Sequence, residues 1–207
     1  GHLAPAASFN FSSGGDTEIN TSIVSKSGLI AFRSDGELSV NENALLDVSP
    51  FSVKFPDQLR TAPAGIVSLL SSGDLSIDDP TVLDFGTDEF DGEGGVLELL
   101  TNSNLSLALS DWEPSRGNWS SGGLGLRIQA DNIERDLDDV LFLNGQGFDG
   151  DIDLLLTGAS EDINVAESQK ITATDLRLAT LDGQLVVSGN LEVSDATADV
   201  VLHGGAG

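Results

Sequence analysis

Acidic residues at alternate positions are the first feature of this sequence that suggests chemistry. Asp149, Asp151 and Asp153 alternate in the stretch DGDIDLLL, and side chains two positions apart lie on the same face of a strand. Asp151 and Asp153 flank an inward-facing Ile152 and are expected on one outer face. There they are predicted to share a cation with Glu98 of a neighbouring repeat, with calcium as the candidate ion. A solvated acidic face explains the same residues without an ion and is the preferred interpretation.

Two tryptophans define a candidate ligand-binding loop. Trp112 and Trp119 lie in SDWEPSRGNWSSGG, a stretch rich in Gly, Ser and Pro, and they are the two tryptophans of the chain. An indole ring offers a large, flat apolar surface with a polar edge, and in an exposed loop this surface suits a sugar ring. The loop therefore predicts carbohydrate binding. Anchoring of the loop onto the body of the protein by the same two rings is the favoured alternative.

No set of residues predicts catalysis. Acid pairs arise by chance in a chain with 34 Asp and Glu residues, and sequence spacing does not give the carboxyl separation that glycoside cleavage requires. His203 has no Ser or Cys partner in a recognisable motif, and no Gly-x-Ser-x-Gly elbow occurs. We therefore expect a non-catalytic protein. The alternative, a polysaccharide-active enzyme, predicts an outer groove in which acids meet Arg127 or Arg177 near the tryptophan loop.

Charge and composition limit the classes of partner. Nine Lys and Arg against 34 Asp and Glu give the 207-residue chain a formal charge of −25, which repels nucleic acids and anionic membrane surfaces. The acidity either attracts cations such as calcium or adapts the protein to salt, and both interpretations stay open. The chain has no cysteine and no apolar run near 18 residues, so neither a disulfide nor a membrane-inserted segment is predicted.

The elements that position these residues come from an internal repeat. GLIAFRSDGELSVNENALLDVS, residues 28–49, aligns without a gap with GIVSLLSSGDLSIDDPTVLDFG, residues 65–86. Further units begin at residues 95, 123, 150 and 175, and DVVLHGG, residues 199–205, opens another. Units of this kind are typical of solenoids, in which each unit buries its inner face only by stacking on its neighbours.

Within each unit apolar residues alternate with polar ones, which predicts short strands. Ile30 and Phe32 share one face, Leu38 and Val40 share the next, and Gly, Asn, Asp and Ser separate the strands. We predict an all-β fold, a parallel β-helix or β-solenoid of about six to seven coils. A β-sandwich also uses short strands with regular turns and is the alternative, although it does not require its units to resemble one another.

The predicted solenoid domain covers residues 28–207, and residues 1–27 form an N-terminal cap or leading strand region. Excursions are expected at residues 50–63, which contain three prolines, and at the tryptophan loop. The stretch DNIERDLDDVLFL has apolar residues at helical spacing after a candidate Asn132 cap. The same stretch also fits a final strand that contains Leu141 and Leu143.

The units GEGGVLELLTNSNLSL and DGQLVVSGNLEV resemble the coils of filamentous-haemagglutinin-like exoproteins and of autotransporter adhesin passengers. The resemblance spans roughly residues 28 to 207. It implies a right-handed parallel β-helix from a bacterial protein that is secreted or displayed on the cell surface and serves in adhesion or biofilm or as a stalk. The Asn-Pro-Asn motif of the two-partner secretion domain is absent, so the resemblance implies an interior or distal segment of a larger protein.

The function expected from this sequence is therefore structural or adhesive. Its expected partner is a cell-surface or extracellular-matrix ligand, with carbohydrate or a second copy of the chain as candidates. The alternative functions are a calcium-dependent carbohydrate-binding module and a polysaccharide-active β-helix enzyme. No cofactor is required by any motif, and calcium is the one candidate.

Overall fold

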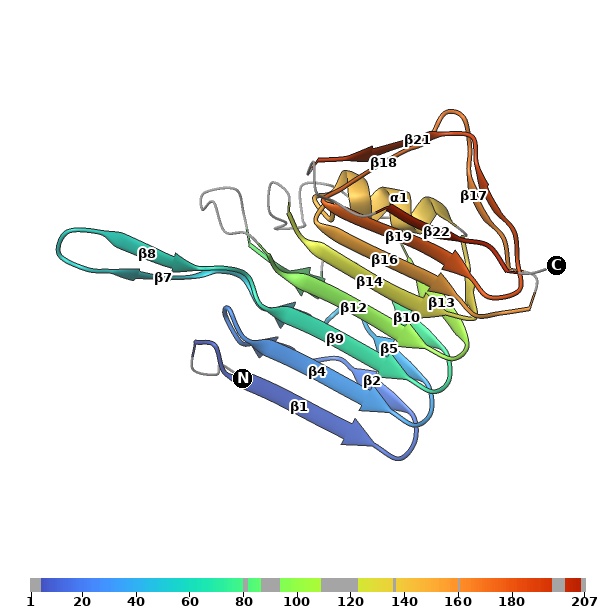
Figure 1. Cartoon of the computed structure of the whole chain (residues 1–207). Coiled ribbons are helices and arrows are strands. Elements are labelled where there is room, and N and C mark those ends of the chain that lie inside the picture. Colours follow the sequence, from blue (N-terminus) through green and yellow to red (C-terminus); the bar gives the residue numbers. More distant parts are fainter. Residues whose placement is uncertain are drawn as a thin grey trace.

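One strand from each repeat contributes to the largest sheet of the protein (Figure 1). The computed structural model describes residues 5–79, 82–86, 94–108, 123–135, 137–159, 161–194 and 200–205. Eight parallel strands make this sheet, in the order β1 (Ser8–Ser13), β4 (Leu29–Ser34), β9 (Ile66–Ser71), β12 (Val96–Thr101), β14 (Gly125–Ala130), β16 (Asp151–Leu156), β19 (Asp175–Thr180) and β22 (Val200–His203). The strands therefore stack in the order of the repeats along the chain.

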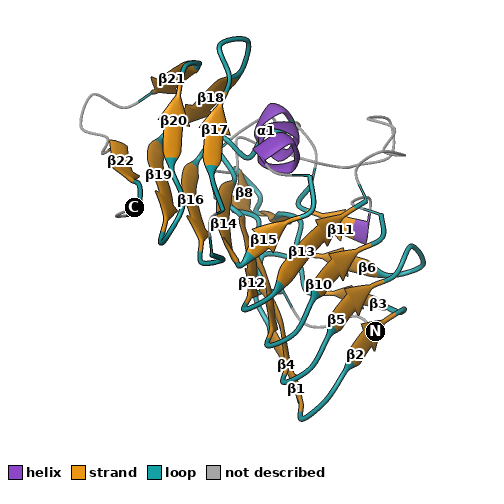
Figure 2. Ribbon diagram, turned by 90° about the vertical axis from the view of Figure 1, so that its right-hand side faces the viewer, coloured by secondary structure: helices purple, strands orange, loops and turns teal. Residues whose placement is uncertain are grey.

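Shorter strands of the same units form two further parallel sheets (Figure 2). The first has five strands, β15 (Asn132–Ile133), β13 (Asn104–Leu107), β10 (Leu75–Ile77), β5 (Leu38–Val40) and β2 (Thr17–Ile19). The second has three strands, β11 (Leu83–Asp84), β6 (Leu45–Asp47) and β3 (Ser22–Val24). Residues 5–27, the predicted cap or leading strand region, supply β1, β2 and β3, which extend all three sheets by one strand.

The alignment of the first two repeats is confirmed residue by residue. Ile30 pairs with Val67 between β4 and β9, and Leu38 pairs with Leu75 between β5 and β10. At the end of the unit, Asp47 pairs with Asp84 between β6 and β11. A slip of one residue would turn every apolar side chain outward, so the shared alternation excludes that register.

The core consists of apolar rows that run across the large sheet. One inward row contains Phe32, Leu69, Leu99, Ile128 and Leu154, each paired with the next across neighbouring strands, and all five are buried. Neighbouring strands lie about 4.8 Å apart, so each apolar side chain packs against its equivalent in the next unit. This contact explains why the positions of this row exchange only among Leu, Ile and Phe.

Buried hydroxyl groups fix the corner after the long strand. The Ser34 hydroxyl donates to the carbonyl of Gly15 at 2.6 Å, and the Ser71 hydroxyl donates to the carbonyl of Gly36 at 2.7 Å. Thr101 makes the equivalent bond to Gly73. In each case the acceptor belongs to the unit that precedes the donor in the chain. The carbonyl groups at these turns and the buried hydroxyl groups thus provide hydrogen-bond partners for each other.

The second half of the chain replaces the two shorter sheets with a helix and new strand pairs. Helix α1 (Leu137–Gly145) packs on β17 (Ile163–Val165) and β18 (Lys170–Ala173). These strands pair in parallel with β20 (Leu185–Val187) and β21 (Asn190–Val193), respectively. The helical interpretation of this stretch is confirmed, but the Asn132 cap is wrong, because Asn132 pairs with Asn104 in the ladder between β15 and β13.

The excursion at residues 50–63 is an antiparallel hairpin of β7 (Phe51–Lys54) and β8 (Leu59–Ala62). It projects away from the stacked sheets (Figure 1), and we call it the arm. The other strand pairings of the described residues are parallel. The protein is thus mostly β with large parallel sheets and a solenoid-like organisation, whereas the sheets of the alternative β-sandwich are antiparallel.

Candidate functional site

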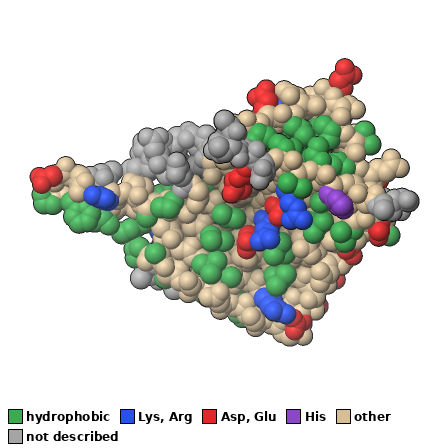
Figure 3. Space-filling model, in the orientation of Figure 1, with side chains coloured by type: hydrophobic (Ala, Val, Ile, Leu, Met, Phe, Trp, Pro, Cys, Tyr) green, Lys and Arg blue, Asp and Glu red, His purple; other side chains and the backbone are tan. Residues whose placement is uncertain are grey.

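A row of charged side chains crosses the outer face of the large sheet. The outward positions on β12, β14, β16 and β19 hold Glu98, Arg127, Asp153 and Arg177, and each residue is the register partner of the next. The signs of the charges alternate along the row, which we call the charge ladder. In Figure 3 charged side chains of both signs gather over the middle of this face. Opposite charges on directly paired positions attract one another, whereas like charges would repel.

Arg127 joins the two acids of the charge ladder. Its guanidinium lies 3.6 Å from Glu98 Oε1, through Nη1, and 3.8 Å from Asp153 Oδ2, through Nε. Arg177 Nη1 approaches the same Asp153 oxygen at 3.4 Å. Both arginine side chains are about half exposed, and exposed ion pairs of this kind contribute about 0–1 kcal/mol to stability. The ladder therefore contributes little to folding and leaves its charges available to a ligand.

The charge ladder borders a groove of about 670 Å³. Its lining includes glycines from the starts of three units, Gly95, Gly125 and Gly150, where the absence of a side chain brings the backbone close to a ligand. The polar side chains that line it are Glu98, Arg127, Asp151, Asp153 and Thr174. Asp153 Oδ1 is buried and has no hydrogen-bond partner in the described structure. A buried acceptor without a partner is costly, so a ligand donor that reached this oxygen after a rotation of the carboxylate would stabilise the site.

The structure separates the carboxylates of the predicted metal site. Asp151 and Asp153 both line the groove, as the alternation predicts, but Glu98 lies two strands away with Arg127 between them. Within the part of the chain that the structure describes, no group of three or more His, Cys, Asp or Glu side chains is arranged to hold a metal ion. A guanidinium between the carboxylates does not fit a calcium ion shared by all three residues, since calcium takes six to eight oxygen ligands. Calcium binding thus stays a prediction, and this geometry does not favour it.

The structure describes the predicted arginines at the groove, but it does not describe the predicted tryptophans. Trp112 and Trp119 lie outside the described residues, so their role stays a prediction. Acids meet Arg127 in the groove, and Arg177 adjoins it through Asp153. The polysaccharide-active alternative also requires the tryptophan loop next to this groove, so it stays a prediction. Sequence reasoning missed Thr174 and the glycine lining. The signal that would have found the ladder is the alternation of Glu, Arg, Asp and Arg at equivalent outward positions of successive units.

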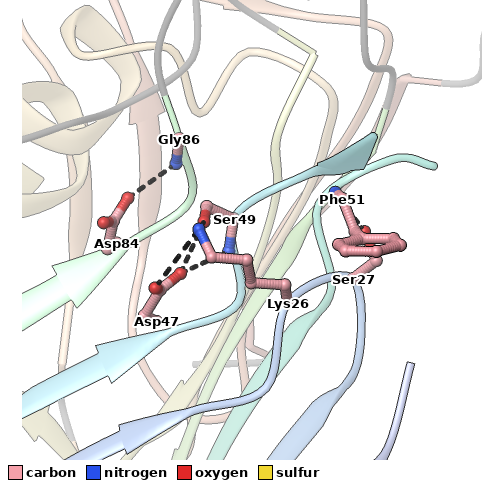
Figure 4. Close-up of polar contacts among 7 residues, drawn as sticks. All are labelled: Lys26, Ser27, Asp47, Ser49, Phe51, Asp84 and Gly86. Atoms are coloured by element: carbon pink, nitrogen blue, oxygen red, sulfur yellow. Dashed lines mark hydrogen bonds and ion pairs between the residues drawn. The ribbon is translucent and has the colours of Figure 1, made fainter. Parts of the chain in front are cut away.

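A second polar cluster lies where β6 and β11 end, at the base of the arm (Figure 4). Asp47 is buried; its Oδ1 accepts hydrogen bonds from the amide of Ser49 at 2.9 Å and from the Ser49 hydroxyl at 2.5 Å. Lys26 Nζ donates to the Ser49 hydroxyl at 3.0 Å and lies 3.7 Å from Asp47 Oδ2. The equivalent residue of the next unit, Asp84, accepts a bond from the amide of Gly86 at 2.8 Å.

This cluster fixes the point where the arm leaves the sheets. The Phe51 amide donates to the Ser27 hydroxyl at 2.8 Å (Figure 4), and Pro50 packs so closely on Gly86 that a Cβ at Gly86 would meet the proline ring. Gly86 also has a φ of +88°, a conformation that favours glycine. These contacts hold the base of the arm against the sheets, so the cluster has a structural role.

Burial raises the pKa of the Asp84 carboxyl, and the negative charge of neighbouring Asp47 raises it further. The Gly86 amide and Lys26 act in the opposite direction. Stacking of like acids in successive units thus has an electrostatic cost, which the chain offsets only in part with Lys26.

Among the described residues, no helix has the length and apolar character needed to cross a membrane. Comparison with known proteins finds no matching family model, no similar curated protein and no similar solved structure. Functional inference for this chain therefore rests on its own geometry.

Proposed function

We propose that this chain is a non-catalytic, adhesive segment of a secreted or cell-surface bacterial protein, and that its groove binds a neutral saccharide. The observation that carries the proposal is the groove itself, with its glycine lining, the charge ladder and the unpartnered Asp153 Oδ1. Specific sites for small polar ligands are concave and place a few polar groups where they fix the orientation of the ligand.

The chemistry of the groove matches the hydroxyl groups of a sugar. A hydroxyl both donates and accepts, so one hydroxyl group is able to donate to Asp153 while another accepts from the exposed Arg127 guanidinium. Three acids and one arginine line the groove, and the whole chain carries −25. Polyanionic glycans are therefore repelled, and a neutral saccharide is the favoured ligand class.

The architecture we propose around this groove is a right-handed parallel β-helix of about six to seven coils. Parallel pairing between equivalent strands of successive units supports it, as do the apolar rows that run through the core. Connections between parallel strands of one sheet are right-handed in about 98% of cases, which supports the hand. A stacked rod of this kind holds a binding surface at a distance from its attachment point, as a stalk or adhesin requires.

A screen of immobilised glycans followed by titration calorimetry tests the proposal. We expect retention of neutral oligosaccharides and not of uronate or sulfated ones. Arg127→Gln and Asp153→Asn should each weaken binding about tenfold, because each removes a charged hydrogen-bonding partner. The matched control is Arg33→Gln, which changes an exposed arginine on the same sheet, outside the groove. Absence of any retained neutral glycan, or equal loss in the control, would refute the proposal.

The same groove favours one second candidate, a polysaccharide-active enzyme, because acids and an arginine meet there. Incubation of the retained glycan with the protein, followed by assay of new reducing ends and of unsaturated products, distinguishes the two. If the wild-type chain forms products and Arg127→Gln does not, the function is enzymatic and not adhesive. Repeating the titration with EDTA shows whether binding depends on calcium.

A further inference from the structure

The outer face of the large sheet carries apolar side chains beside the charge ladder (Figure 3). Strands β4 to β16 hold six large apolar residues at outward positions: Leu29, Ile66, Leu70, Val96, Leu100 and Leu155. Ile66 is 38% exposed, and the other five are partly buried. An apolar surface of this kind marks an interaction site, and a second sheet packed face to face is the partner that fits a sheet.

The same face carries almost no net charge. Its outward positions from β4 to β19 hold three arginines and four acids: Arg33, Arg127, Arg177, Glu98, Asp151, Asp153 and Asp175. Their net charge is −1, whereas the whole chain carries −25. Because like-charged surfaces repel one another, two copies of this acidic chain meet less repulsion through this face than through the rest of the surface.

The order of the charges in the ladder is self-complementary. Along β12, β14, β16 and β19 the signs read minus, plus, minus, plus. A second copy whose stack runs in the opposite direction presents plus, minus, plus, minus. Glu98 then faces Arg177 of the second copy, and Arg127 faces Asp153 of the second copy. Two-fold symmetry repeats both pairs, so all four charges of each ladder meet an opposite charge.

A two-fold axis that lies between the two sheets, parallel to the strands, produces this arrangement. The strands of both copies then run in nearly the same direction, as in aligned sheet packing, with the sheets about 10 Å apart. Arginine and carboxylate side chains that extend from both sheets bridge this distance. In the adjacent outward row, the axis places Leu100 opposite Ala179 and Leu155 opposite Gln129. Apolar contacts in such an interface supply affinity, and paired charges fix its register.

The alternative two-fold axis does not fit the charges. An axis that runs along the stack also brings the two sheets face to face, but it places every ladder residue opposite itself, so that Glu98 faces Glu98. Like charges in direct opposition are destabilising. The axis parallel to the strands places Asp151 opposite Gly125 and Asp175 opposite Val96 in the remaining outward row, so acids do not face acids there. The charge order therefore selects this axis.

We propose that two copies of this chain form a two-fold dimer through the outer faces of their large sheets, with the two charge ladders paired in opposite order. The contact uses the same surface on both copies, so it closes on itself and stops at two copies. It covers the groove, so a second copy and a saccharide exclude each other there. This self-association goes beyond the proposed saccharide binding and does not depend on it.

Sedimentation velocity of the 207-residue chain without saccharide tests the proposal. At physiological salt a Debye length of about 8 Å screens the repulsion between the acidic bodies, and we expect a dimer whose fraction grows with concentration. Arg127→Glu places an acid opposite Asp153, and Asp153→Arg places an arginine opposite Arg127, twice in each dimer. Each single variant should weaken the dimer about a hundredfold, or about tenfold for each reversed pair. The matched control is Arg33→Glu, which makes the same change of charge on β4, outside the four ladder strands, and should leave the dimer unchanged.

A mixture of the two single variants provides the decisive observation. In the mixed pair, the introduced acid faces the introduced arginine, and the native Asp153 of one copy faces the native Arg127 of the other, so the dimer should return. The double variant Arg127→Glu/Asp153→Arg should also dimerise, although neighbouring ladder charges within each copy then repel. Leu100→Gln/Leu155→Gln removes apolar contacts and should weaken the dimer about tenfold. Circular dichroism confirms that each variant folds.

Four results would overturn the proposal. The first is a wild-type chain that stays monomeric at every concentration, and the second is wild-type dimerisation by either single variant. The third is a mixture of the single variants that forms no dimer. The fourth is equal weakening by Arg33→Glu and Arg127→Glu, which would make net charge responsible instead of the ladder. Because these measurements contain no saccharide, their failure is separate from a failure to retain a glycan.

Discussion

Truncation of Leu99 is the sharpest test of the stacked core. Leu99 is fully buried on β12 and lies in an inward row between Leu69 of β9 and Ile128 of β14. The backbone ladders hold both neighbours about 4.8 Å away, so the cavity left by Leu99→Ala has little freedom to collapse. Core Leu→Ala substitutions cost about 2.7–5 kcal/mol, and more where the cavity persists. We therefore expect a loss of about 3–5 kcal/mol for this variant.

Two leucines of the same sheet provide matched controls. Leu100 is the next residue on the same strand, but it faces outward and is only partly buried. Leu202 occupies the same row as Leu99, but within the described residues its one register partner is Leu178, and it is 45% exposed. Truncation of a half-buried leucine removes about half of the transfer free energy of a buried one, or about 1 kcal/mol. Leu100→Ala and Leu202→Ala should thus cost about 1 kcal/mol or less.

Thermal unfolding followed by circular dichroism in the β region measures these differences. A protein of this size loses about 2–4 °C in Tm for each kcal/mol. Leu99→Ala should lower Tm by roughly 6–20 °C and each control by roughly 2–4 °C, by the same scaling. Equal shifts for Leu99→Ala and Leu100→Ala would refute the reasoning, because they would show that the two faces of β12 are equally buried.

Three further predictions concern electrostatics, metal and backbone. The pKa of Asp84 is raised above its ordinary value of 3.8 in the folded protein. The folded protein therefore keeps the Asp84 proton up to a higher pH than the unfolded chain does. The contribution of Asp84 to stability falls as pH rises from the unfolded-state pKa to the folded-state pKa. Asp84→Asn should therefore raise Tm at pH 7 and make no difference below the unfolded pKa. The pKa of Asp74 is lowered by hydrogen bonds from Ser103 and Asn104. Asp74→Asn should therefore lower Tm at pH 7, and this difference should disappear as pH falls through the pKa of the folded state. A change of Tm at pH 7 in the same direction for both variants would contradict this account. EDTA in place of millimolar calcium, at fixed ionic strength, should leave Tm unchanged because Arg127 separates the acids of the ladder, and a large rise with calcium would establish a metal site instead. Gly65→Ala should prevent stable stacking because its Cβ would overlap the carbonyl oxygen of Gly28, while Gly14→Ala, which has open space, should have little effect on Tm.

The sequence is informative about the strands because the alternation and the turn residues recur together. The pairings of Ile30 with Val67 and of Leu38 with Leu75 follow from the gapless alignment of the first two units. The alignment does not predict the helix and the new strand pairs that follow β15. Period-two alternation tells which side chains face inward, but it does not tell which strands pair in the shorter sheets. The replacement of those sheets by α1 and the β17–β20 pair therefore required the structure.

The sequence predicts which acidic residues belong to the candidate site, but it does not predict how the site residues are arranged. Alternation alone places Asp151 and Asp153 on the outer face, and both line the groove. The predicted metal site placed Glu98 next to these two residues because that prediction considered only acidic side chains. The unit that begins at residue 123 lies between the units of Glu98 and Asp153, and it inserts Arg127. The unpartnered state of Asp153 Oδ1 depends on side-chain packing and has no signature in the sequence.

The buried hydroxyls at the corners give the fold a direction. Ser34, Ser71 and Thr101 each donate to a carbonyl of the unit that was synthesised before their own. A chain that emerges with its N-terminus first thus presents each of these hydroxyls to an acceptor of the preceding unit that is already in place. Stacked units fold by propagation from a formed neighbour. Growth from the N-terminus during translation would let these stacked units fold one after another as they appear.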